Sequence, residues 1–261
     1  MPHAPIPHAI LLFFAAVVAG VINSVAGGGG FVAFPALVFA GIPPINANAT
    51  NTVALWPGTV AASGAYRREL RHKTQWLAML PLFAVSLFGA VLGAILLLKT
   101  PQPTFMRIIP WLLLGATTLF IFGGRISSYI RARMQQHQRA DALHLAGITV
   151  LQLITSVYIG YFGAGAGMIM LALFALMGME NIHNMNAFKT VVASLANGVA
   201  VITFIVAGAV AWPQAVVMIA GAAIGGYGGA YFAQKLDPVA VRRVVIAIGL
   251  AMTAYFFVHP Q

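Results

Sequence analysis

The sequence predicts an all-α polytopic membrane protein, built from two inverted-topology repeats with short glycine-interrupted helices that are broken or re-entrant. Of its 261 residues, 61% are hydrophobic and only 7% are charged, whereas soluble proteins carry about a quarter charged residues. Long apolar runs recur along the chain, and its basic residues cluster between them. Two further apolar runs are short, and each follows a glycine-rich break. Such pairs mark the broken helices of transporters.

The apolar runs define the membrane elements in order. They cover residues 9–26, 30–41, 47–65, 75–98, 104–123, 144–162, 166–178, 187–208, 213–233 and 239–258. A crossing takes about 20 residues, so 30–41 and 166–178 are too short to cross. The first run ends Ser24-Val25-Ala26, which resembles a signal-peptidase site, but no Lys or Arg precedes it. We interpret it as a membrane helix.

The two halves repeat at the residue level. With shifts of 136 to 138 residues, Gly28 falls on Gly165, Asn48 on Asn186 and Trp76 on Trp212. We therefore expect a first transmembrane repeat over 8–123, a basic cytoplasmic linker over 124–143 and a second repeat over 144–258.

Orientation follows from the basic residues, because cytoplasmic loops are enriched in Lys and Arg. The segments 67–73, 125–139 and 235–243 are basic, and 99–107 and 209–212 are poor in basic residues. The basic segments should be cytoplasmic and both termini periplasmic. Each half then makes an odd number of crossings, either five or three plus a re-entrant hairpin.

Small residues at a spacing of four let helix backbones approach closely. Gly89 and Gly93 have this spacing, as do Gly225 and Gly229. Packing within the chain is the simple interpretation, and a homodimer through these seams stays open.

Polar residues inside the membrane are the candidates for function, because each is costly unless used or paired. Lys189 is the one basic residue that lies outside the loops between the apolar runs. Its counterpart in the first half is Asn51. Helix starts and glycine breaks offer N–H groups to anions. We expect the two clusters to meet near the midplane as a substrate site. The candidate residues are Gly28, Gly29, Gly30, Asn48, Thr50, Asn51, Thr52, Gly165, Gly167, Asn186, Lys189 and Thr190.

Simpler roles stay open for the same residues. Asn and Thr near a helix start act as N-caps, Lys189 can extend to the interface, and the glycines can serve packing alone. Glu180, the one acid near the site, is a candidate proton carrier or a partner of Lys189, or it is an ordinary loop residue.

Composition also argues against other functions. The chain has no Cys, and its seven His are scattered without metal-ligand spacing, so we expect neither a metal nor another cofactor. No nucleophile has an evident base, which disfavours an enzyme. The net charge of +10 lies in short clusters, which is the pattern of a membrane protein rather than of a nucleic-acid partner. The expected partners are a small anion and the lipid bilayer.

These motifs resemble a known family. Residues 23–31, 34–37, 41–44 and 47–52 read NSVAGGGGF, FPAL, GIPP and ANATNT. They resemble the first-half signature of the TauE/SafE sulfite exporter family. Residues 163–167 and 186–190, which read GAGAG and NAFKT, are similar to its second half. The resemblance implies a bacterial inner-membrane permease for sulfite, sulfonates or related small sulfur-containing anions.

The expected function is export of such an anion by alternating access. A negative cell interior expels a monoanion with about 2.3 kcal/mol per 100 mV, so export needs no coupled ion. Two alternatives stay open. One is a proton-coupled importer of a small anion or solute that uses Glu180, and the other is a membrane subunit that transports nothing.

Overall fold

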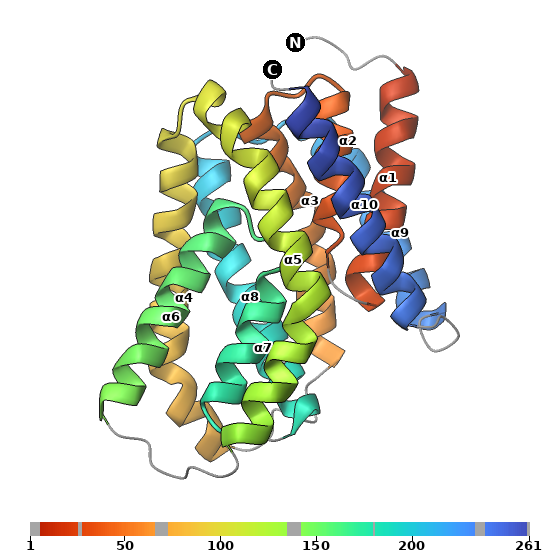
Figure 1. The fold of residues 1–261 in the computed structure, drawn as a ribbon. Coiled ribbons are helices and arrows are strands. Elements are labelled where there is room, and N and C mark those ends of the chain that lie inside the picture. The colour runs from red at the N-terminus through yellow and green to blue at the C-terminus, as the bar shows by residue number, and fades with distance from the viewer. Residues whose placement is uncertain are drawn as a thin grey trace.

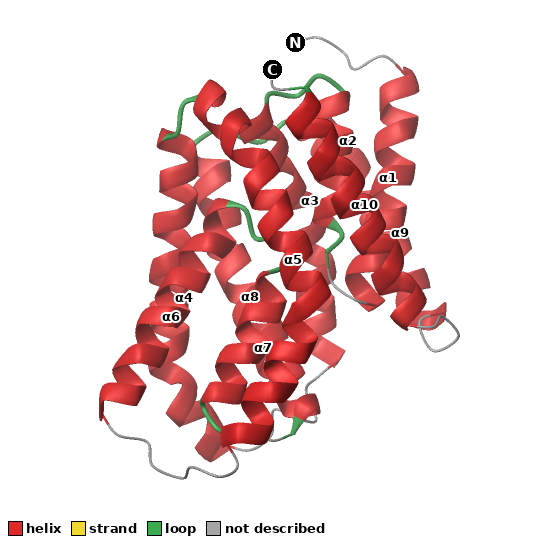
Figure 2. Cartoon of the chain, viewed as in Figure 1, coloured by secondary structure: helices red, strands yellow, loops and turns green. Residues whose placement is uncertain are grey.

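The computed structural model describes residues 6–25, 28–65, 73–134, 142–179, 181–232 and 238–259. In these ranges the chain forms ten α-helices and no strand (Figure 2), so the predicted all-α membrane fold is confirmed. The helices are α1 (Ile6–Val25), α2 (Gly30–Phe39), α3 (Pro44–Ala65), α4 (Lys73–Lys99), α5 (Gln102–Met134), α6 (Ala142–Tyr161), α7 (Ala166–Leu176), α8 (Ile182–Val206), α9 (Trp212–Phe232) and α10 (Pro238–Val258). Each corresponds to one apolar run of the sequence.

Several helices extend beyond their apolar runs. Helix α5 continues to Met134, so residues 124–134 of the expected linker are helical. Arg242 and Arg243, expected in a loop, lie in the first turns of α10. Helix α8 begins at Ile182, about two turns before Lys189. The polar residues of α3 and α8 therefore lie inside helices, and only their side chains are free to bind a ligand.

The chain path contains two hairpins of opposite direction (Figure 1). Helix α1 starts at the end of the bundle that holds both termini, and α2 returns to that end. Helix α6 starts at the opposite end, and α7 returns there. The remaining helices run between the two ends. This path agrees with three crossings plus a hairpin in each half, and inverted duplication at the residue level stays a prediction.

Helix length and composition identify some of the crossing helices. In the described part of the chain, four segments are long and apolar enough to cross a membrane: Leu80–Lys99, Gln102–Ile130, Asn184–Val206 and Ala240–Val258. Among the four hairpin helices, α2 and α7 have 10 and 11 residues and fall short of a full crossing. Helices α1 and α6 have 20 residues each.

Helices from the two halves of the chain pack against each other. Helix α1 packs along α9, and α4 packs along α6, so the hairpin of each half lies against the fourth helix of the other. Both seams depend on glycine. A Cβ on Gly225 would collide with the carbonyl oxygen of Val17, and a Cβ on Gly93 would collide with that of Val157. Helices α3 and α8 also pack together, and so do α5 and α10. This arrangement brings both glycine breaks to the interior of the bundle.

Candidate functional site

The first glycine break separates α1 from α2. Gly28 has a φ of 94°, which disfavours any residue with a side chain. A Cβ there would lie 2.8 Å from the ring of Phe120 on α5. Gly29 is the N-cap of α2 and gives it no side-chain cap. The fully buried ring of Phe31, which packs edge-on against Phe120 at 5.6 Å, holds the start of α2 in place.

The second break repeats this geometry between α6 and α7. Gly165 has a φ of 75° and is the N-cap of α7, again without a side-chain cap. A Cβ there would lie 3.1 Å from the carbonyl oxygen of Ala116, also on α5. Both short helices thus begin at a left-handed glycine turn against the same helix, with no side chain capping their first N–H groups.

Each break faces a polar side chain of the helix that follows. A Cβ on Gly30 would lie 3.4 Å from Nδ2 of Asn51, and a Cβ on Gly167 would lie 3.4 Å from Cδ of Lys189. The sequence repeat pairs Gly30 with Gly167 and Asn51 with Lys189. Equivalent positions therefore make equivalent contacts, with an amide in one half and a cation in the other.

The Lys189 cluster lies on α8. The half-buried Lys189 donates from Nζ to Oδ1 of Asn186 over 2.9 Å. Thr190 donates to the carbonyl oxygen of Asn186 over 2.7 Å, and Ser63 of α3 donates to that of Thr190 over 3.3 Å. Within the described residues the ammonium therefore bonds a neutral amide. Glu180, expected as proton carrier or partner, lies outside the described residues.

The asparagine cluster lies on α3. Asn48 is 1% exposed and donates from Nδ2 to the carbonyl oxygen of Tyr161, at the end of α6, over 3.0 Å. Thr50 accepts a hydrogen bond from the backbone N–H of Ala211, and Thr52 donates to the carbonyl oxygen of Asn48. The Oδ1 atoms of Asn48 and Asn51 are buried without a hydrogen-bond partner. The three-residue spacing of Asn48 and Asn51 places them on one face of α3.

The structure does not bring the two clusters together. Thr190, next to Lys189, contacts Ser63, and Ser63 follows Asn51 by twelve residues of α3, or about 18 Å of helix. Between them, Trp56 of α3 donates to the carbonyl oxygen of Ser194 over 2.9 Å, and its ring lies against Gly198. These contacts offset the two clusters along α3, and the expectation that both contribute to one substrate site stays a prediction.

Comparison with known proteins agrees with this architecture. Residues 12–256 match the family described as "Sulfite exporter TauE/SafE". The chain belongs to the TauE/SafE family.

Relatives cover nearly all of the chain. A "Probable membrane transporter protein" of Haemophilus influenzae is 30% identical over 247 residues, which are 94% of this chain and 92% of the relative. A "Probable membrane transporter protein ORF9" of Sinorhizobium sp is 28% identical, with coverage of 95% and 92%. "Probable membrane transporter protein YfcA" of Escherichia coli K12 is 27% identical, with coverage of 94% and 87%. No solved structure matches the chain. The protein is thus a multi-pass membrane transporter of the TauE/SafE family.

Sequence reasoning on this TauE/SafE protein missed two residues of the α3–α8 contact. Trp56 and Ser63 belong to a stripe on α3 that also holds Thr52 and Thr59, at spacings of four, three and four residues. That spacing is the signature of one helix face. A search for polar and aromatic residues at this period would have indicated the contact with α8.

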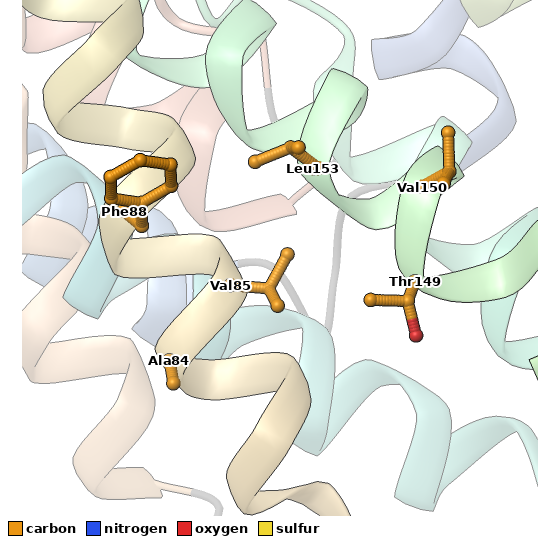
Figure 3. A pocket seen from close by; sticks show the side chains of 6 residues that line it. All are labelled: Ala84, Val85, Phe88, Thr149, Val150 and Leu153. Atoms are coloured by element: carbon orange, nitrogen blue, oxygen red, sulfur yellow. The ribbon is translucent and has the colours of Figure 1, made fainter. Parts of the chain in front are cut away.

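The same TauE/SafE chain has an apolar groove of about 290 Å³ between α4 and α6. Figure 3 shows the six side chains that line it: Ala84, Val85, Phe88, Thr149, Val150 and Leu153. Phe88 and Val150 are exposed, as expected of a surface that faces lipid. None of the candidate site residues lines the groove, which therefore belongs to neither polar cluster.

Proposed function

We propose that this protein exports a small sulfur-containing anion of the sulfite type by alternating access, and that the Lys189 cluster binds the anion. The protein would lie in the bacterial inner membrane, with its basic segments cytoplasmic and both termini periplasmic. The observation that carries the proposal is a lysine inside a membrane helix whose described hydrogen-bond partner is a neutral amide, beside an uncapped helix start.

The chemistry of the Lys189 cluster suits a small oxyanion. A cation in the membrane is costly unless an opposite charge accompanies it, and the described hydrogen-bond partner of Lys189 is a neutral amide. An anion at Lys189 would supply that charge. The start of α7 at Gly165 and Gly167 adds the positive end of a helix dipole and backbone N–H groups.

Because the two clusters are separate, the proposed pathway has two successive binding sites for the anion, which we call stations. The first is the Lys189 cluster and the second is the asparagine cluster. The Lys189 cluster lies nearer the end of the bundle opposite the termini, because α8 starts at that end (Figure 1). This would be the cytoplasmic end. The asparagine cluster lies toward the other end, and Trp56 lies between the two clusters. An anion would bind at Lys189 from the cytoplasm and reach Asn48 and Asn51 after a conformational change.

The membrane potential supports export as the direction. A negative interior drives a monoanion outward with about 2.3 kcal/mol per 100 mV. No coupled ion is then required.

Anion binding to the purified protein tests the proposal. A thermal-shift screen should compare sulfite, sulfate, thiosulfate, sulfoacetate, taurine and chloride. A ligand at a hundred times its Kd stabilises the folded state by about 2.7 kcal/mol. We expect a selective shift with a sulfur oxyanion, and flux of that anion out of vesicles that follows an imposed potential. If no anion shifts the unfolding temperature or moves across vesicles, the proposal fails.

Gly167→Leu should weaken sulfite binding while the charge of Lys189 is kept. The larger side chain would occupy the space of the lysine stem and displace the ammonium from Asn186. The displaced ammonium would no longer donate a hydrogen bond to the bound anion. Loss of a hydrogen bond to a charged group costs about 1.5–3 kcal/mol, so the Kd for sulfite should rise about tenfold or more. Gly147→Leu on α6 is the control, because a Cβ there meets open space. Equal sulfite affinity in the two variants would contradict the placement of the site.

A further inference from the structure

We infer that the transported anion also carries a hydrogen-bond donor, such as a hydroxyl, an ammonium or an acidic proton, and that Oδ1 of Asn48 and of Asn51 accept from it. The inference rests on the proposed function and adds to it the chemistry of the second station. The observation behind it is a pair of buried carbonyl oxygens, three residues apart on α3, that have no partner in the described structure.

The orientation of Asn48 is set by its surroundings. The nitrogen and oxygen of an amide are distinguished by their partners, and Nδ2 of Asn48 donates to the carbonyl oxygen of Tyr161 over 3.0 Å. A flipped amide would place two oxygens against each other. Oδ1 is therefore the free atom, and it can only accept a hydrogen bond.

Leaving these oxygens unpaired is costly. A buried acceptor without a partner keeps its full desolvation penalty, and nearly all buried polar groups are paired in folded proteins. Only three such side-chain atoms occur in the described part of the chain, and the third belongs to Gln152 on α6. Two of the three therefore lie one turn apart on α3, where Asn51 faces Gly30 and Asn48 bonds to Tyr161 at the end of α6.

The two stations then differ in what they recognise. The Lys189 cluster offers a cation to the negative group of the cargo. The asparagine cluster offers two unpaired carbonyl oxygens, which favour a group that donates a hydrogen bond. A fully ionised oxyanion satisfies the first station only. A protonated oxyanion or a hydroxylated or aminated sulfonate satisfies both.

Two sulfonates of similar size test the inference on the purified full chain. 2-Hydroxyethanesulfonate carries a hydroxyl where 1-propanesulfonate carries a methyl group. We expect the hydroxylated compound to bind about tenfold more tightly, since it satisfies an acceptor that the other leaves unpaired. The double variant Asn48→Leu/Asn51→Leu removes both acceptors and should make the two affinities equal. Gln152→Leu is the matched control, because it removes the third unpaired oxygen, away from the pathway, and should leave the preference unchanged.

Each outcome separates the inference from the function. Equal affinities in the unmodified protein would overturn the inference and leave anion export standing. A preference that persists in the double variant Asn48→Leu/Asn51→Leu would show that other atoms accept the hydrogen bond, and would overturn it too. If neither sulfonate binds while sulfite does, hydroxylated and aminated sulfonates are excluded as cargo, and only a protonated oxyanion satisfies the inference. If no anion binds, the proposed function fails first.

Discussion

Replacing Lys189 with Ala should abolish anion transport in vesicles and leave the fold intact. The substitution removes the positive charge of the proposed site and its hydrogen bond to Asn186. A hydrogen bond to a charged group contributes about 1.5–3 kcal/mol, so the Kd for sulfite should rise about 10- to 150-fold. Burying an unpaired cation is costly, so the ligand-free variant should unfold no earlier than the unmodified protein. Flux and the unfolding temperature, with and without sulfite, measure both effects.

Lys99→Ala is the matched control for this experiment. Lys99 ends α4 and is exposed, so its loss removes the same charge without touching the cluster. We expect unchanged flux in that variant. Unaltered transport in Lys189→Ala would remove Lys189 from the mechanism, and equal losses in both variants would indicate an effect of net charge alone.

Gly225→Ala should destabilise the protein far more than Gly226→Ala, one residue away on α9. A methyl group on Gly225 would strike the carbonyl oxygen of Val17 on α1, whereas one on Gly226 meets nothing within 4 Å. Overpacking costs about 1–3 kcal/mol, and a backbone atom cannot move aside as a side chain can. An alanine in a helix interior is favoured over glycine by about 1 kcal/mol, so Gly226→Ala should be neutral or stabilising.

Thermal unfolding in detergent measures the difference between the two variants. The matched test on the other seam is Gly93→Ala on α4, where a methyl group would strike the carbonyl oxygen of Val157. We expect a comparable loss there. Equal unfolding temperatures for Gly225→Ala and Gly226→Ala would mean that α1 and α9 do not pack as closely as described.

Much of the fold could be predicted from the sequence. The apolar runs locate every helix, because the bilayer demands long apolar segments. The glycine breaks mark the starts of α2 and α7, because Gly28 and Gly165 adopt φ values that other residues avoid. Helix ends were less certain. The polar first turns of α8, from Ile182, carry no apolar signal, so the helix was expected to begin near Lys189.

The arrangement of the site could not be predicted in the same way. The repeat relates Gly30 to Gly167 and Asn51 to Lys189, and the structure contains a Gly30–Asn51 contact and a Gly167–Lys189 contact. The repeat could not give the separation of the two pairs, because that depends on how far α3 and α8 overlap. The overlap is set by contacts such as Trp56 with Ser194 and Ser63 with Thr190. The stripe on α3 indicates the face that meets another helix, but it does not give the residues of α8 that lie against it, which are more than a hundred positions away.

Because helices of the two halves pack against each other, the order of synthesis determines when this packing can form. Val17 meets Gly225, which the ribosome adds 208 residues later. At 5–20 residues per second the wait is roughly 10–40 s. Until then the face of α1 that packs against α9 lacks its native neighbour, although α1 also contacts α2 and α3. The packing of α1 is therefore complete only after α9 has been inserted.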